Sequence, residues 1–455
     1  MDRSGESQKP LVGAIPTLLL ILLAHVWVVS DGKWWPWPQH TAFYSHLADG
    51  FMHGQLGLPD VPPPKLLALP DPYDPHANWA LRLHDAVLFN GRYFVYWGPV
   101  PALLVIPFCA FVGQTHPTFG DQYLVFIFST GVVIVATIFM IQIQRRLFSW
   151  QRMPAVLLGA LSLGMGAPLL IALLRPAVYE AAILAGQFFL LSGLLLIWIA
   201  LNRQDRRGLP MALAGICFTL SVGSRVSLAP AIGVIVLLAL WRLPRPVSIF
   251  GLLLPLAIGA ALYAGYNFGR FGSMLEFGLR YQLAGANQHT MVASQYSSPR
   301  FIVPNLLVYT LAEPDYLKKF PYVQASTPRW GAAMFHLGPT YRIERLVGLV
   351  ETQAFLLFAI AAIGWRKQDR TANWLRRSLW VAVVLGFIPA LMIDGGTERY
   401  LMDMVPGCTI LAALGFWKLL ALSESRRRER TIIELLAGAL VIVQCLTGLL
   451  LVFGI

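Results

Sequence analysis

Residues 122–146 read QYLVFIFSTGVVIVATIFMIQIQRR, an apolar run that ends in two arginines. About 20 mostly apolar residues are enough for an α-helix to cross the hydrocarbon core of a bilayer. This run is therefore predicted to be a transmembrane helix. Short cytoplasmic loops carry an excess of basic residues, so Arg145 and Arg146 are predicted to lie on the cytoplasmic side.

Similar apolar runs occur along the whole chain. Eleven predicted crossings span residues 11–30, 122–144, 154–174, 181–201, 209–224, 226–241, 247–267, 346–365, 375–393, 400–422 and 431–453. Hydrophobic residues make up 56% of the 455 residues and charged residues only 13%, whereas a soluble domain has about 25% charged residues. The composition therefore excludes a soluble globular protein. It predicts an all-α polytopic membrane protein with about eleven transmembrane helices.

The net charge of +12 is distributed unevenly along the chain. With the N-terminus inside, more than half of the 35 Lys and Arg fall on the cytoplasmic side, and most of the 23 Asp and Glu fall outside. This pattern follows the positive-inside rule, so the basic charge is interpreted as a topology signal and not as a nucleic-acid site. We predict a multi-pass protein of a bacterial inner membrane, with a cytoplasmic N-terminus and large periplasmic loops.

Segment 98–114 is apolar but short, and it contains three prolines. Counting it as a crossing would invert every later loop and place the basic loops outside. It is therefore predicted to be an outer juxtamembrane helix that does not cross. The predicted parts are the N-terminus with the first helix (1–30), outer loop 1 (31–121), helices two to seven (122–267), outer loop 2 (268–345) and helices eight to eleven (346–455).

Outer loop 1 begins with apolar residues at helical spacing between Tyr44 and Gln55. This spacing predicts an amphipathic helix on the outer leaflet that ends near Gly54. Asp49 projects from near the apolar edge of this helix, where partial loss of water makes a carboxylate more basic. Asp49 is thus the first candidate for a catalytic base, with a solvated surface residue as the alternative. Tyr44 is a candidate for the lining of a substrate cavity.

Two further acids in outer loop 1 are candidates for the same role. Asn90-Gly91, between alternating apolar residues, predicts a β-hairpin. Asp85 precedes this hairpin, and His84 beside it could share a polar network or line the cavity. Asp74 precedes a proline, and such pairs are common in turns, so a turn is the leading interpretation of Asp74.

Neither histidines nor cysteines indicate a metal centre at sequence level. The pair His84 and Asp85 supplies too few ligands for a metal site. The four cysteines lie far apart in apolar stretches without metal-ligand spacing, so they are interpreted as small core residues. No cofactor is predicted, and a divalent metal stays an open alternative.

Five arginines are predicted to lie outside, near the membrane plane. They are Arg175, Arg225, Arg270, Arg280 and Arg399. Arginine in this position is costly unless it is paired or functional, and its guanidinium binds phosphate in a fork. These residues are therefore candidate phosphate ligands. The alternative is that they snorkel to the membrane surface or pair with nearby acids, namely Glu180, Glu276, Asp394, Glu398 or Asp403. Glu180, Glu276 and Tyr400 are also candidates for the cavity lining.

Four features of the chain together resemble a family of membrane enzymes. They are a single helix leading into an outer loop that opens with the Tyr44–Gln55 helix, the segment Gly98-Pro99-Val100-Pro101 with its ending Phe111-Val112-Gly113, the crossing that ends in Arg145-Arg146-Leu147-Phe148, and the late segment Glu398-Arg399-Tyr400-Leu401 with Pro406. This layout resembles the GT-C superfamily of glycosyltransferases that use polyprenyl-phosphate sugars. Protein O-mannosyltransferases and the lipid A aminoarabinose transferase are similar types.

The resemblance implies a GT-C fold and an activity at the outer face of the membrane. It implies inverting transfer of a sugar from a polyprenyl-phosphate donor to a hydroxyl or amine of a glycan, lipid or protein. It further implies a carboxylate base, for which Asp49 is the leading candidate. It also implies arginines that stabilise the departing phosphate, for which Arg399 is the leading candidate. The chain departs from the family pattern at His40-Thr41, where an acidic pair is usual. Asp74 and Asp85 therefore stay as candidate bases.

Two other classes of function are compatible with the same outer cavity and cations. A flippase or transporter of lipid-linked sugars predicts charged residues in mid-membrane and internal repeats, and the chain shows few of the first and none of the second. A non-catalytic partner in envelope polysaccharide assembly predicts that the outer acids can be replaced freely. The glycosyltransferase is the leading interpretation.

Overall fold

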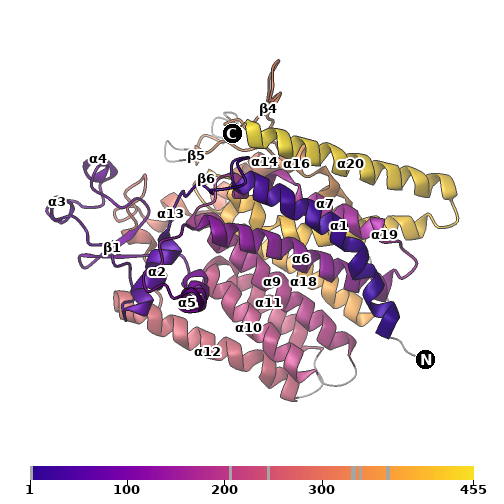
Figure 1. Ribbon diagram of the computed structural model, residues 1–455, viewed down its shortest axis with the longest axis horizontal. Helices are drawn as coiled ribbons and strands as arrows, with labels where there is room; N and C mark the ends of the chain where they lie inside the picture. The colour runs from indigo at the N-terminus through magenta and orange to yellow at the C-terminus, as the bar shows by residue number, and fades with distance from the viewer. Residues whose placement is uncertain are drawn as a thin grey trace.

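The computed structural model describes residues 4–203, 207–242, 246–328, 335–337, 341–364 and 369–454. Long helices form one bundle, and the segment 31–121 gathers at one end of it (Figure 1). Seven helices in these ranges are long and apolar enough to cross a membrane. They are α1 (Ser4–Val29), α6 (Gln122–Leu147), α9 (Val178–Asn202), α12 (Pro246–Phe271), α18 (Arg370–Leu391), α19 (Val405–Leu422) and α20 (Arg427–Phe453).

An eighth span is formed if one bent helix pair is counted as a single crossing. Helix α7 (Pro154–Gly164) and helix α8 (Ala167–Leu174) are bent by 41° at their junction. The prediction of an all-α polytopic membrane protein is therefore confirmed, whereas the predicted number of eleven crossings is not. The predicted spans 209–224 and 226–241 form the shorter helices α10 (Gly208–Ser224) and α11 (Ala229–Leu240).

The predicted crossing at 346–365 is wrong as a single helix. Its described part is divided into α16 (Leu349–Thr352), η4 (Ala354–Phe358) and α17 (Ala359–Ala362). The break falls at Gln353, and the N–H of Phe355 that the break releases is bonded by the Gln444 side chain of α20 at 3.3 Å. Broken backbone is tolerated at membrane depth where a neighbouring helix satisfies it. A hydropathy pattern does not reveal such a partner.

The short elements predicted in the first insertion are present. Helix α2 (Phe43–Met52) ends just before Gly54, and helix α5 (Val100–Val112) has 13 residues. At 1.5 Å per residue, α5 is about 20 Å long, which is too short to cross a core of about 30 Å. Strands β1 (Val87–Phe89) and β2 (Arg92–Phe94) form the predicted hairpin, with Asn90 and Gly91 at positive φ in the turn.

The remaining elements are short and belong mainly to the two insertions. They are α3 (Pro64–Leu67), α4 (Pro75–Asn78), η1 (Val226–Leu228), η2 (Leu279–Tyr281), α13 (Ala293–Tyr296), η3 (Pro299–Phe301), α14 (Ile302–Leu311), β3 (Asp315–Tyr316), β4 (Val323–Gln324), β5 (Arg342–Ile343), β6 (Gly395–Gly396) and η5 (Glu398–Asp403). The strands pair as β1 with β2, β3 with β4, and β5 with β6.

The two insertions are joined by main-chain hydrogen bonds. The N–H of Asp85 donates to the carbonyl of Leu283 at 3.0 Å, and the N–H of Leu283 donates to the carbonyl of Ala86 at 2.9 Å. The second insertion is also joined to the loop after α18, because its strand β5 pairs in parallel with β6 of that loop. Segments that are about 200 and 50 residues apart in sequence therefore form one cap, which positions the site described below.

The first and last helices of the bundle end on the same side. The ring of Trp27, near the end of α1, lies 5.5 Å from the ring of Phe453, near the end of α20. In Figure 1 the C-terminus accordingly lies beside the end of α1 that leads into the first insertion. The end of α20 therefore lies on the same side of the bundle as the start of the first insertion.

Candidate functional site

A cavity of about 630 Å³ lies where the two insertions meet the ends of α9, α10 and α18. Its lining includes seven of the charged or aromatic residues singled out in the sequence. These are Asp85, Arg225, Glu276, Arg280, Asp394, Arg399 and Tyr400. The site therefore draws on segments spread across most of the chain. Burial of several ionisable groups around one cavity is typical of functional sites.

Asp85 is the buried carboxylate of this cavity, with only 8% of its surface exposed. It stands just before β1, and its φ of 66° is rare for a residue with a side chain. Its carboxylate accepts hydrogen bonds from the hydroxyl of Tyr179 and, at 3.2 Å, from the amide of Gln282. Strained backbone of this kind persists where surrounding contacts enforce it, and it clusters at functional sites.

The surroundings of Asp85 change its acidity. Burial raises the pKa of its carboxyl group above the ordinary value, while the charges of His84 and Arg399 act in the opposite direction. His84 is exposed, and its Nε2 lies 3.4 Å from the Asp85 carboxylate. Asp85 is therefore a carboxylate with increased basicity that faces a cavity, as a general base requires.

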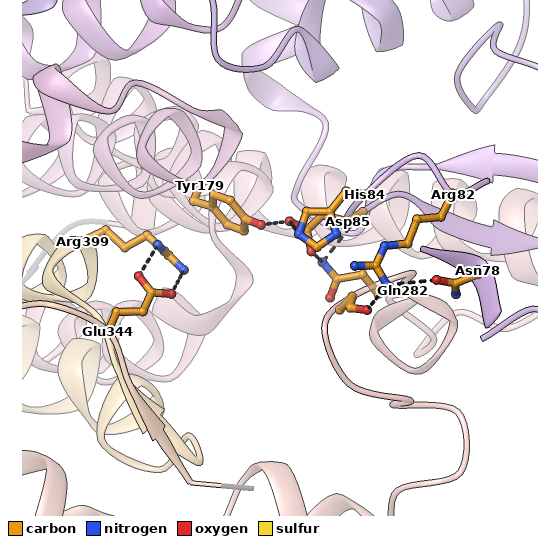
Figure 2. Close-up of polar contacts among 9 residues, drawn as sticks. Asn78, Arg82, His84, Asp85, Tyr179, Gln282, Glu344 and Arg399 are labelled. Carbon is orange, nitrogen blue, oxygen red and sulfur yellow. Dashed lines mark hydrogen bonds and ion pairs between the residues drawn. The ribbon is translucent and has the colours of Figure 1, made fainter. Parts of the chain in front are cut away.

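Arg399 lies across Tyr179 from Asp85, as Figure 2 shows. Its guanidinium carbon is 4.5 Å from the centre of the Tyr179 ring, and the hydroxyl of the same tyrosine donates to Asp85. The guanidinium forms a two-pronged pair with Glu344, with both N–O distances 3.1 Å. The Glu344 side chain is 58% exposed, so an anion entering from solvent can compete for this fork.

Arg225 faces the same cavity, but its guanidinium is paired with an acid of the protein. Its guanidinium forms a two-pronged ion pair with Asp403, whose side chain is 1% exposed. The amide of Gln187 also donates to the main-chain oxygen of Asp403 at 3.1 Å. The pair links the end of α10 to η5. Arg225 therefore pairs with a nearby acid, which was the alternative to phosphate binding considered for it from the sequence.

Arg280 also pairs with an acid, Glu276, at 2.8 Å, but its side chain is 57% exposed.

Other predicted site residues lie away from the cavity lining. Asp49 contacts His53 and His116. Asp74 accepts a hydrogen bond from the His76 N–H at the start of α4, as expected of a turn residue. Arg270 turns inward and donates to the carbonyl of Val95 at 2.6 Å.

Three more predicted site residues also have other surroundings. Tyr44 is fully buried in the core. Glu180 accepts a hydrogen bond from the Ala177 N–H at the start of α9. Arg175 is exposed at the end of α8. These three residues therefore lie at helix ends or in the core rather than on the cavity wall.

The site residues predicted from the sequence did not include Tyr179, Gln282 or Glu344. Gln282 and Glu344 carry no local signal, because their positions follow from pairing with distant segments. The N–H of Glu344 donates to the carbonyl of Gly396 at 2.8 Å, which holds this acid beside Arg399. Tyr179 had a weak signal, since it stands next to Glu180 at the start of a predicted crossing.

Thr41, which stands where the resembling family usually has an acid, has a structural role in this protein. The hydroxyl of Thr41 donates to the Asp121 carboxylate at 2.6 Å and accepts from the Val178 N–H at 2.9 Å. Asp121 also accepts from the N–H groups of Phe43 and Tyr44, which open α2. Asp121 thus caps α2 from a distant part of the chain. In this way Thr41 joins the starts of α2 and α9.

The sequence matches no protein-family model and no curated protein sequence, but the fold has known counterparts. The oligosaccharyltransferase of Archaeoglobus fulgidus, in its apo form, matches with a TM-score of 0.51 and 14% identity, over 96% of this chain and 56% of that one. ArnT of Cupriavidus metallidurans, bound to undecaprenyl phosphate, matches with a TM-score of 0.50 and 10% identity, over 97% and 75%. This chain spans little more than half the length of the archaeal protein. The predicted GT-C resemblance is confirmed at the level of the fold.

Proposed function

We propose that this chain is an integral membrane glycosyltransferase that transfers a sugar from a polyprenyl-phosphate donor to an acceptor hydroxyl or amine. The observation that carries the proposal is one cavity in which Asp85 and Arg399 contact the same tyrosine, Asp85 at the hydroxyl of Tyr179 and Arg399 at its ring. Such a pair combines a proton acceptor with a cation suited to phosphate. The fold supports this function, because it is shared with an oligosaccharyltransferase and with ArnT, which was solved with undecaprenyl phosphate.

In the proposed reaction, Asp85 removes the proton from the acceptor while the acceptor oxygen or nitrogen attacks the anomeric carbon. The bond from the acceptor to this carbon forms, and the bond from the carbon to the phosphate oxygen breaks. The electron pair leaves with the polyprenyl phosphate, and attack from the opposite face inverts the anomeric configuration. Arg399 stabilises the negative charge that develops on the leaving phosphate.

The other cavity arginines have supporting roles in this proposal. Arg280 is exposed and can approach the donor when it releases Glu276. Arg225 is held by Asp403 and therefore shapes the cavity wall. The charge pattern of the sequence supports a cytoplasmic N-terminus and periplasmic insertions in a bacterial inner membrane. The acceptor is a glycan, lipid or protein on that outer side.

The test of this function is sugar transfer by the purified full-length protein in lipid vesicles. A panel of radiolabelled polyprenyl-phosphate sugars would be supplied with a membrane extract as the source of acceptors. We expect one donor to lose its label to an acceptor, with free polyprenyl phosphate as the second product. Boiled protein is the control for spontaneous hydrolysis.

Two results would contradict the proposed transfer. Label that crosses the bilayer without leaving its lipid carrier would identify a flippase. Tight donor binding without release or translocation, with every donor and extract, would identify a non-catalytic assembly partner.

Glu344 has a predicted effect on donor binding. Replacing Glu344 by Gln removes the carboxylate that competes with the donor phosphate for the Arg399 fork. We expect the KM for the donor to fall about fivefold with kcat unchanged, because an ion pair with one exposed partner is worth about 1 kcal/mol at most. Glu313→Gln, at an exposed acid of the same insertion, is the matched control. A higher KM in Glu344→Gln would instead show that Glu344 orients Arg399 for the donor.

A further inference from the structure

Asp49, His53 and His116 form a cluster at the C-terminal end of α2, separate from the residues that line the cavity. One carboxylate oxygen of Asp49 lies 3.1 Å from Nδ1 of His53 and 3.0 Å from Nδ1 of His116. Asp49 and His53 are four residues apart and share one face of the helix end. His116 comes from the segment between α5 and α6. The three ligand atoms all lie within 4.8 Å of one another.

The chemistry and spacing of these atoms suit a transition metal. Zn²⁺ binds imidazole nitrogen and carboxylate oxygen at about 2.0–2.2 Å in a tetrahedron, so its ligand atoms lie about 3.3–3.5 Å apart. The two closest separations in the cluster are within a few tenths of an ångström of this value. Both imidazoles are exposed, so a metal ion can enter from solvent and keep a water as its fourth ligand.

We propose that Asp49, His53 and His116 bind one divalent transition-metal ion, of which Zn²⁺ is the representative. Two nitrogens and one oxygen favour Zn²⁺ over Mg²⁺, which prefers oxygen ligands and keeps several waters. The rings of His53 and His116 are stacked 4.7 Å apart and inclined by 8°, and the Nδ1 atoms of both lie beside the same oxygen of Asp49. Binding replaces the contact between His53 Nδ1 and the main-chain oxygen of Asp49 at 2.9 Å.

The metal would act as a clamp on α2. The segment from His116 to Asp121 runs antiparallel to this helix, because Asp121 bonds the N–H groups of Phe43 and Tyr44 at its start. His116 meets Asp49 at the other end of the helix. A metal ion at this end would fix both ends of α2 to one segment, independently of any transfer reaction.

Zinc binding by the tag-free full-length protein, stripped with a chelator, tests this proposal. Equilibrium dialysis with radioactive zinc should give one ion per chain, and a tenfold excess of Mg²⁺ should not displace it. We expect His116→Ala and His53→Ala to weaken binding by about 100-fold or more, since loss of an outer-shell partner alone costs about 10–100-fold. His76→Ala, at an exposed histidine of the same insertion, should bind as the wild type does.

Thermal unfolding gives a second measurement that is independent of catalysis. Zinc should raise the unfolding midpoint of the wild type and of His76→Ala but not that of His116→Ala, because a ligand stabilises only the state that binds it. Without zinc, wild type and His116→Ala should unfold together, since His116 is exposed. Binding that is unchanged in both histidine variants, or zinc that Mg²⁺ displaces, would overturn the proposed site.

Discussion

Replacing Asp85 by Asn is expected to lower the rate of sugar transfer by about 10²–10⁴-fold, the usual contribution of a general base. Asn has the size of Asp and can still accept from Tyr179 or Gln282, but it cannot take a proton from the acceptor. The loss should therefore appear in kcat with little change in the KM for the donor. The measurement is initial-rate transfer of labelled sugar, with the variant shown to be folded by thermal unfolding.

The controls separate Asp85 from the other acids of the insertions. Asp315→Asn, at an exposed acid of the second insertion, should transfer at the wild-type rate. Asp49→Asn distinguishes the two candidate bases directly. A loss of 100-fold or more in Asp49→Asn, with Asp85→Asn still active, would return the catalytic role to the acid first selected from the sequence.

The pH profile provides a further check on Asp85. A general base must be ionised, so transfer should decline as the pH falls through the pKa of Asp85. Burial raises that pKa above the ordinary value, so the decline should begin at higher pH than for a solvated aspartate of about 3.9. The residual activity of Asp85→Asn should lack this acid limb. A wild-type rate that stays level down to the pKa of a solvated aspartate would contradict the role of Asp85.

Removal of Arg225 is expected to cause the largest loss of stability. Arg225→Met leaves the buried Asp403 carboxylate without its partner, and breaking a buried ion pair in this way costs about 3–5 kcal/mol. Asp403 is 2% exposed, so water cannot compensate. The measurement is the free energy of unfolding in detergent, compared with that of the wild type.

A double variant tests the structural interpretation of this arginine. In Arg225→Met with Asp403→Leu, both charges are absent, and most of the lost stability should return. If Arg225→Met is as stable as the wild type but has a much higher KM for the donor, then Arg225 binds phosphate, as the sequence analysis first suggested.

Local patterns in the sequence determined the elements of this protein. The apolar run at 122–144, closed by two arginines, predicted α6, and the turn Asn90-Gly91 predicted the hairpin. The spacing from Tyr44 to Gln55 predicted α2. In each of these segments, periodicity, turn chemistry and length act within a few residues of one another, so the information is present in the segment itself.

The tertiary structure alone decided which of the candidate residues meet. Asp85 reaches the cavity because its N–H pairs with Leu283, about 200 residues later. Glu344 reaches Arg399 because β5 pairs with β6. Arg225 forms an ion pair with Asp403, 178 residues away. Hydrogen bonding and burial between distant segments depend on the whole packed arrangement, and a single sequence carries no local signal for them. The all-α membrane architecture and these local elements could therefore be predicted, whereas the composition of the cavity required the fold.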